Sequence, residues 1–222
     1  MEKQEKFFLH GLYDTANYGC EAIVRGTEMI LKNICPEATI TLSSWNPSYD
    51  KTRLEGADLK IINARRYPRY SPISAYNKIV RGFRDEWTIL NEPINIIGND
   101  DVVLSIGGDR YTLGFSDAFP ENLIRFGCRA ITKTRKFIIW GASIGPFSKN
   151  KIQENTIRDF LHSVHLITCR EPITVSYLRS IGVEGNVVTC ADPAFMISEP
   201  FSIHQDVNQS PRIGINLSPL SA

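Results

Sequence analysis

Ionisable side chains directly follow apolar, strand-like runs in this sequence. Asp109 comes just after the run DVVLSI, and Arg170 with Glu171 comes just after LITC. A carboxylate at such a position can bind hydroxyl groups or act as a general base. A guanidinium group can hold a phosphate or a carboxylate bidentately. Purely structural interpretations stand beside these: Asp109 can cap a turn, and Arg170 can pair with Glu171 or with Asp192 in CADPAF.

Small residues occupy two further loops after apolar runs. Gly107 and Gly108 in SIGGD let the backbone turn sharply and let another group approach closely. Ser143 and Gly145 lie in GASIGPF, where no GxSxG pattern surrounds the serine, so a hydrolase nucleophile elbow is not indicated. Both loops predict candidate substrate-binding positions, and tight structural turns explain them equally simply.

The stretch LHGLYDTANYGCEAIVRG carries Asn17 and Gly19 at the entrance to a helix-like segment. Free N–H groups at a helix N-terminus favour an anion, and an asparagine there can cap the helix or contact a sugar hydroxyl. Neither a Walker loop nor GxGxxG is present. A capped turn and a ligand-binding loop both remain open for this stretch.

These residues must be positioned by alternating strands and helices. The strands are unbroken apolar runs, which is typical of parallel strands covered on both faces. We therefore expect an α/β fold, a Rossmann-like parallel sheet with helices on both faces. Strands are expected at 7–9, 39–42, 59–62, 101–106, 136–140, 166–169 and 187–190, and helices at 18–34, 117–132, 151–164 and 172–181.

Two helical segments carry more specific expectations. In 18–34, an inner face is expected from apolar residues that include Met29 and Ile34. Residues 73–91 have helical spacing in Tyr76, Ile79 and Phe83, among others, but Gly82 weakens that assignment.

Composition excludes several classes of protein. The 222 residues carry 25 basic and 24 acidic side chains, so the net charge of +1 gives no reason to expect nucleic acid as a partner. No apolar run approaches a membrane span, and the N-terminus is not a signal peptide. The five widely spaced cysteines contain no CxxC and indicate neither a disulfide framework nor a metal site. A cytoplasmic protein is the expectation.

The domain organisation is expected to be uneven. Residues 1–197 form one Rossmann-like domain, 198–211 a polar, proline-containing linker, and 212–222 the first strand of a truncated second domain. Formation of a homo-oligomer stays open, because an apolar face left uncovered by a missing domain would favour self-association.

Taken in order, five segments resemble the polysaccharide pyruvyl transferase family: the Asn17/Gly19 loop with its helix, SIGGD, GASIGPF, CREPITVSYLRSIGV and ADPAF. They span about residues 9–195. The resemblance implies the N-terminal half of a GT-B-like fold and transfer of pyruvate from phosphoenolpyruvate to a sugar of an exopolysaccharide, a cell-wall polymer or its precursor. Phosphoenolpyruvate is then a substrate, and no cofactor or metal is implied.

The resemblance also implies roles for the residues singled out above. Arg170 and Asp109 are expected to be catalytic. The expected substrate-binding residues are Asn17, Gly19, Gly107, Gly108, Ser143, Gly145, Glu171 and Asp192. The family's second domain carries an Arg-x-His-type motif thought to supply acid chemistry, and this sequence has no such motif.

We therefore expect the 222 residues alone to be inactive, the general acid coming from elsewhere. A nucleotide-sugar-dependent glycosyltransferase of GT-B architecture is an alternative. So is a non-catalytic saccharide-binding or assembly module.

Overall fold

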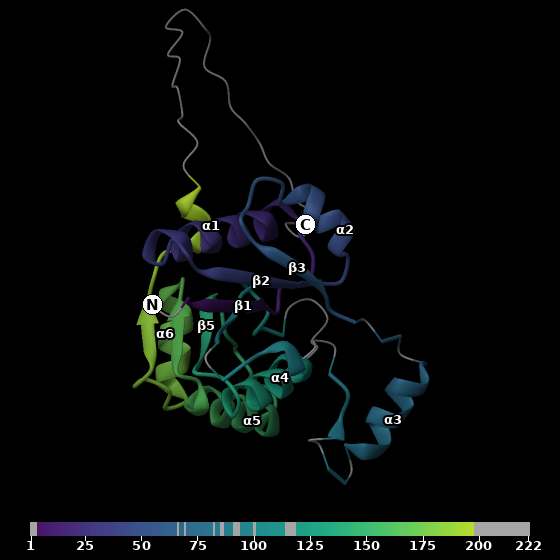
Figure 1. The fold of residues 1–222 in the computed structure, drawn as a ribbon. Coiled ribbons are helices and arrows are strands. Elements are labelled where there is room, and N and C mark those ends of the chain that lie inside the picture. The colour runs from purple at the N-terminus through teal and green to yellow at the C-terminus, as the bar shows by residue number, and fades with distance from the viewer. Residues whose placement is uncertain are drawn as a thin grey trace, which may run out of the picture.

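The structure, a computed structural model, describes residues 4–65, 67–68, 70–81, 83–84, 87–90, 94–99, 101–113 and 119–197. One seven-stranded, wholly parallel sheet organises these residues, in the spatial order β3-β2-β1-β4-β5-β6-β7 (Figure 1). The strands are β1 Lys6–His10, β2 Thr39–Ser44, β3 Lys60–Asn63, β4 Val102–Ser105, β5 Lys136–Ala142, β6 Leu166–Cys169 and β7 Val187–Thr189. All seven predicted strands are confirmed, with bounds that shift by at most two residues.

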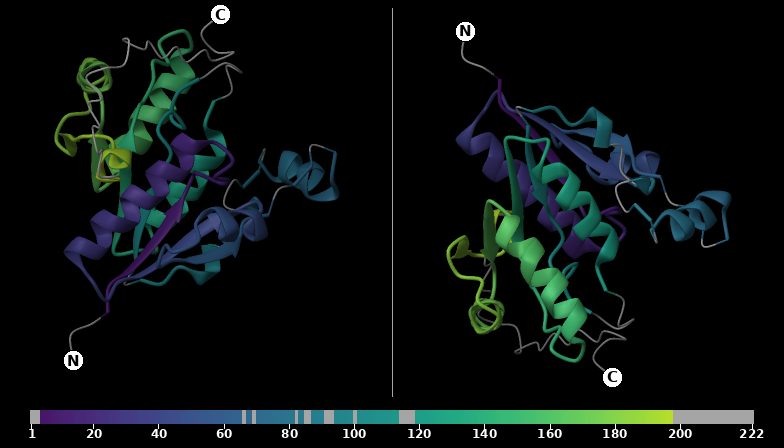
Figure 2. Two further views of the ribbon diagram at one scale, coloured as in Figure 1. Left: turned by 90° about the horizontal axis from the view of Figure 1, so that it is seen from above. Right: turned by 90° about the horizontal axis from the view of Figure 1, so that it is seen from below.

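Helices cover both faces of the sheet, as predicted (Figure 2). They are α1 Tyr18–Ile34, α2 Pro47–Arg53, α3 Pro72–Val80, α4 Glu121–Ile131, α5 Lys151–Ser163 and α6 Pro172–Ser180, together with the 3₁₀ turns η2 Ile94–Ile96 and η4 Pro193–Met196. α1 lies on one face together with η4, and α4 and α5 pack against each other on the other (Figures 1 and 2).

Neighbouring residues of one strand supply the two halves of the core. In β1, Phe8 packs into a cluster with α4 and α5, while Leu9 packs into a second cluster with α1. The alternation follows from the strand period of two, because successive side chains point to opposite faces. Burial on both faces explains why these strands read as continuous apolar runs in the sequence.

The predicted inner face of α1 is partly wrong. Ile34 is 69% exposed and Met29 lies at the surface, whereas Val24, Thr27 and Leu31 are buried. Ile34 is the last residue of the helix, and its apolar side chain is left largely exposed there. The helix bounds 18–34 are confirmed.

The predicted linker (198–211) and second-domain strand (212–222) lie outside the described residues. None of the described helices is both long and apolar enough to cross a bilayer.

Candidate functional site

The loops that carry the predicted site residues meet at one edge of the sheet. All seven strands run parallel, so their carboxyl ends share that edge. The loops after β1, β4, β5, β6 and β7 therefore converge there. The structure brings together Gly108, Ser143, Arg170, Glu171 and Asp192, and leaves Asn17, Gly19 and Gly145 in separate local roles.

Arg170 lies at the centre of a polar cluster. Its Nη1 donates to Asp192 Oδ2 at 2.6 Å and its Nε donates to Ser143 Oγ at 3.1 Å. The same Nε lies 3.3 Å from Glu171 Oε1. Ser143 Oγ in turn donates to Glu171 Oε1 at 2.5 Å. Arg170 thus pairs with Glu171 and with Asp192 at the same time. The sequence had offered these as alternative partners, and together they hold the guanidinium in one orientation.

Gly108 supplies the space for this guanidinium. A Cβ atom at Gly108 would lie 2.8 Å from Arg170 Nη1 and 3.0 Å from Nη2, closer than real Cβ atoms approach. The Gly108 carbonyl also accepts from the Ser143 amide at 2.6 Å, which ties the loop after β4 to the loop after β5. The close approach of Arg170 explains the second glycine of the pair, Gly108.

One amino group of Arg170 remains available. Within the described part of the chain, Nη2 has no hydrogen-bond acceptor, and the side chain is 23% exposed. Glu171 and Asp192 more than balance the positive charge of Arg170. The arrangement can orient a donor towards a ligand, but it offers little net attraction for an anion.

Asp109 lies beside this cluster in the loop after β4. It is exposed, and its carboxylate makes no hydrogen bond or ion pair with another described residue. Burial, and then the charges of Asp14 and Asp109, raise the pKa of the Cys20 thiol. The two carboxylates therefore both lie near Cys20, in the first turn of α1.

The residue after Asp109 brings a second cation to this edge. The Arg110 guanidinium lies 5.4 Å from the centre of the Tyr13 ring, a cation–π contact. The backbone turns at Gly107, where φ is +117°, and this turn brings the Arg110 side chain close to Gly107. Neither Asp14 nor Arg110 was among the predicted site residues. Their position in polar stretches directly after strands was the available signal.

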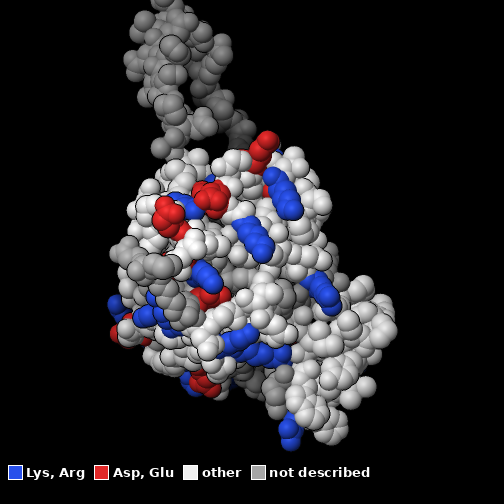
Figure 3. All heavy atoms as spheres, viewed as in Figure 1, with Lys and Arg blue, Asp and Glu red and all other residues white. Residues whose placement is uncertain are grey.

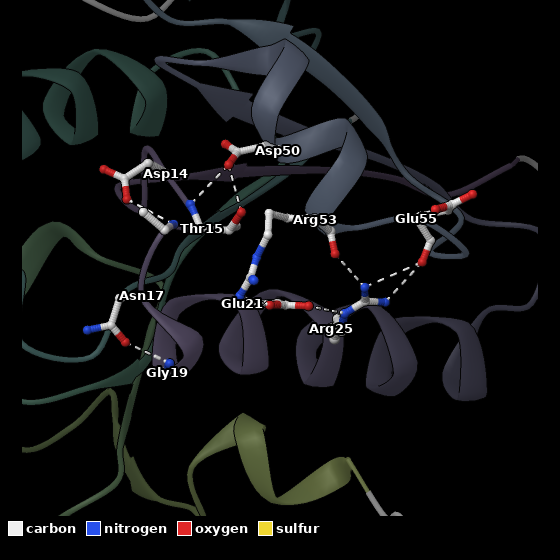
Figure 4. Close-up of polar contacts among 10 residues, drawn as sticks. Asp14, Thr15, Asn17, Gly19, Glu21, Arg25, Asp50, Arg53 and Glu55 are labelled. Atoms are coloured by element: carbon white, nitrogen blue, oxygen red, sulfur yellow. Dashed lines mark hydrogen bonds and ion pairs between the residues drawn. The ribbon is translucent and has the colours of Figure 1, made fainter.

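Asn17 has the capping role that the sequence left open. Its Oδ1 accepts from the Gly19 amide at 2.7 Å, and its own backbone is extended, as expected of an N-cap (Figure 4). The cap uses one of the two lone pairs of Asn17 Oδ1. Gly19 lies in the first turn of α1, and its amide is the donor in this contact.

The loop before α1 is anchored by a residue that sequence reasoning missed. Asp50 of α2 is fully buried, and its carboxylate accepts from the Thr15 amide at 3.0 Å and from Thr15 Oγ1 at 2.6 Å (Figure 4). It also accepts from Ser44 Oγ at 2.6 Å. Three donors satisfy the buried charge. Asp50 thereby fixes the carboxyl-edge loop that holds Asp14.

An ion-pair network lies farther along α1. Glu21 pairs with Arg25 at 2.9 Å and with Arg53 of α2, and Arg25 also donates to the carbonyl of Arg53 at 2.6 Å (Figure 4). The Arg53 guanidinium stacks over Tyr18 at 4.6 Å. These contacts fasten α2 to α1.

Gly145 has a packing role. A Cβ atom there would lie 2.2 Å from the Tyr177 ring, and φ is +77°. The Tyr177 hydroxyl accepts from the Phe147 amide at 3.0 Å, so α6 closes directly over the 143–147 loop. Gly145 therefore contributes to the edge by letting α6 approach.

The histidines give no sign of a metal centre among the residues described. His165 Nδ1 accepts from the Phe137 amide at 3.2 Å, and His10 is fully buried with its ring 4.2 Å from Phe126. A search of the described chain for three or more His, Cys, Asp or Glu side chains that could hold one metal ion finds none.

Comparison with known proteins identifies a family. The sequence model described as "Polysaccharide pyruvyl transferase" matches residues 17–214. No curated protein matches the chain. An uncharacterized protein from Klebsiella pneumoniae subsp. pneumoniae NTUH-K2044, known from a crystal structure, is 21% identical, with a TM-score of 0.41. That match covers 87% of this chain and 51% of the Klebsiella chain, so this chain spans about half the length of that protein.

Proposed function

We propose that this chain, which belongs to the polysaccharide pyruvyl transferase family, forms the acceptor-binding half of an enzyme that moves pyruvate from phosphoenolpyruvate to a saccharide. The acceptor belongs to an exopolysaccharide, a cell-wall polymer or a precursor of either. None of the described cysteines forms a disulfide, which fits the cytoplasmic location that we propose for the reaction.

The charge at the carboxyl edge is the observation that supports the acceptor assignment. In the described loops after β1, β4, β6 and β7, the four carboxylates of Asp14, Asp109, Glu171 and Asp192 outnumber the two guanidinium groups of Arg110 and Arg170. Such a surface repels phosphoenolpyruvate, which carries a phosphate and a carboxylate. Neutral sugar hydroxyls, in contrast, donate well to carboxylates.

The proposed reaction needs three kinds of group. Protonation of the enol methylene of phosphoenolpyruvate gives an oxocarbenium-like centre, which requires an acid. Two acceptor hydroxyls add to that carbon and lose their protons, and inorganic phosphate leaves, giving a pyruvate ketal. Asp109 is the exposed carboxylate that we assign to accept a hydroxyl proton. We assign Arg170 Nη2 as a donor to a substrate oxygen.

The remaining groups lie outside this cluster. The acid and the cations that hold the departing phosphate are supplied, on this proposal, by another part of the enzyme. Gly107, Gly108, Ser143, Glu171 and Asp192 set the orientation of Arg170 and the shape of the edge.

Phosphate release from phosphoenolpyruvate tests the proposal. The full-length protein is incubated with phosphoenolpyruvate and a panel of oligosaccharides, and products are identified by mass spectrometry. Saccharide-dependent phosphate release with a pyruvate ketal on the sugar is the expected result.

Two other outcomes would contradict the proposal. Sugar transfer from a nucleotide-sugar, without use of phosphoenolpyruvate, would indicate a glycosyltransferase. Saccharide binding with no turnover of either donor would indicate a binding or assembly module. A parallel thermal-shift series with both donors separates these outcomes from an acceptor missing from the panel, because a true donor raises the unfolding temperature by itself.

A further inference from the structure

A segment between β3 and β4 projects away from the body of the molecule. It includes α3 and stands apart from the sheet and its covering helices in two directions of view (Figures 1 and 2). We call residues 65–90 the α3 projection; the statements below concern its described residues. It begins at the carboxyl end of β3, the edge that carries the candidate site.

The α3 projection exposes large apolar side chains at helical spacing. Tyr76 and Ile79 lie three residues apart on α3, the spacing of one helix face, and Phe83 follows in the turn after the helix ends at Val80. Ile79 is 65% and Phe83 85% exposed, and Trp87 farther along is 54% exposed. Only Val80 of α3 is buried. The helical spacing noted in the sequence is present over α3, and these side chains face solvent.

Contiguous exposed apolar side chains of this size mark an interaction surface. In an ordinary amphipathic helix the polar face is solvated and the apolar face is covered. Here the apolar face lies uncovered on an element that extends beyond the domain. Whatever covers this apolar face must therefore come from outside the described residues.

Basic side chains outnumber acidic ones in the α3 projection. Residues 65–90 contain six Lys or Arg and two Asp or Glu, Asp85 and Glu86, which lie outside the described residues. Arg65, Lys78 and Arg84 are exposed. In the space-filling view the described residues of the projection, at lower right, are mostly uncharged, with some blue side chains among them (Figure 3). The nearly neutral whole molecule thus carries a locally positive, apolar surface.

The charged groups of Arg81 and Arg84 remain exposed to solvent. The Arg84 side chain is exposed, and its guanidinium lies 4.9 Å from the centre of the Trp87 ring. Arg81 pairs with Glu121 at 3.2 Å, but both side chains are well exposed, so the pair contributes little and is readily exchanged.

A hollow of about 760 Å³, lined by both polar and apolar side chains, lies beside the helix. Ser74, Asn77, Lys78 and Arg81 contribute to its lining. The Ser74 hydroxyl and the Asn77 amide already donate to the carbonyls of Pro68 and Ile89, which leaves the two cations as donors for a phosphate ester. These four residues recur at i, i+3, i+4 and i+7, so the hollow lies on another face of the helix than the exposed apolar side chains.

We propose that the α3 projection docks on an anionic phospholipid membrane. Exposed aromatic and aliphatic side chains enter the boundary between headgroups and acyl chains, while Lys and Arg contact the headgroup phosphates. A second copy of this chain fits less well, because self-pairing would bring two basic surfaces together. Docking would hold the carboxyl edge of the sheet near the membrane surface.

Vesicle co-sedimentation tests this proposal without any measurement of activity. The purified full-length protein is mixed with phosphatidylcholine vesicles, with or without phosphatidylglycerol. We expect binding only when phosphatidylglycerol is present, and weakening by added salt. Arg65→Ala and Lys78→Ala should each lower the affinity about fivefold. The double variant Ile79→Ser/Phe83→Ser should lower it by more than tenfold.

A matched control is available on α5. Ile152 is 79% exposed and lies outside the α3 projection, so Ile152→Ser should leave vesicle binding unchanged. Circular dichroism should show all variants folded, because exposed side chains contribute little to stability.

Three results would overturn the proposal. These are equal binding to both kinds of vesicle, no vesicle binding by the parent protein, or equal loss in the Ile152→Ser control. If the parent is dimeric by light scattering and Ile79→Ser/Phe83→Ser makes it monomeric without vesicle binding, a second copy covers the surface. Since the readout is vesicle binding, its failure does not bear on pyruvyl transfer.

Discussion

Asp192→Ala is the substitution that probes the Arg170 cluster most directly. The Asp192 carboxylate accepts from Arg170 Nη1 at 2.6 Å and from the Ala194 amide at 2.9 Å, where it caps η4. The side chains of Arg170 and Asp192 are 23% and 19% exposed, so solvent partly screens the pair. We assign about 1–2 kcal/mol to the pair, below the cost of breaking a fully buried one.

Loss of the cap adds about 1 kcal/mol. The expected fall in the free energy of unfolding for Asp192→Ala is therefore about 2–3 kcal/mol. Asp192→Asn separates the two contributions, because asparagine caps as well as aspartate but cannot neutralise Arg170. It should cost about 1–2 kcal/mol.

Urea unfolding followed by far-ultraviolet circular dichroism at pH 7 measures these differences by linear extrapolation. Glu184→Ala is the matched control: Glu184 lies 3.9 Å from Arg179, and both side chains are more than 60% exposed. It should change stability by less than about 0.5 kcal/mol. If Asp192→Ala costs no more than this control, Arg170 is not held as the structure shows, and the orienting role of the cluster is wrong.

Three further expectations concern other loops. Asn17→Ala should lower stability by about 1 kcal/mol in urea unfolding, because it removes the α1 cap; no loss would return Asn17 to a ligand-binding role. Gly145→Ala should lower the thermal midpoint by several degrees, since its Cβ would clash with Tyr177. A crystal structure with α6 unmoved would contradict that reasoning. At pH 8, iodoacetamide should label the exposed Cys128 and spare Cys169, because burial raises the pKa of the Cys169 thiol from 9.0 to about 11. The Cys169 thiolate fraction is then about a hundredfold lower than for an unshifted thiol, and comparable labelling rates by mass spectrometry would refute this.

The sheet was predictable from the sequence for a specific reason. Strands buried on both faces require continuous apolar runs, and runs such as DVVLSI have few other interpretations when helices alternate with them. The family followed from the order of loops at strand ends, and the match to residues 17–214 confirms it.

The helix α2 could not be predicted in the same way. Its sequence PSYDKTR has no apolar periodicity, and it is held by Asp50, whose partners Thr15 and Ser44 lie elsewhere in the chain. A buried aspartate among polar residues looks like a surface residue until its donors are placed around it. Tertiary contacts determine this element.

The roles of the site residues were predictable only as alternatives. Whether Arg170 pairs or remains available depends on how closely Glu171 and Asp192 approach it, which no spacing reveals. The same holds for Gly145, whose neighbour Tyr177 lies on a different element. The outward apolar face of α3 was missed because periodicity identifies a helix face but not what covers it.

The central claim is that the carboxyl edge of this chain receives the saccharide, and Asp109→Asn in the full-length enzyme tests it most directly. Asp109 is exposed, and its carboxylate has no hydrogen-bond or ion-pair partner within the described chain, so the substitution should not change stability. With phosphoenolpyruvate and an accepted saccharide, kcat/KM for the saccharide should fall by about 10²-fold or more, while KM for phosphoenolpyruvate stays unchanged. A raised KM for phosphoenolpyruvate with normal kinetics for the saccharide would contradict the assignment.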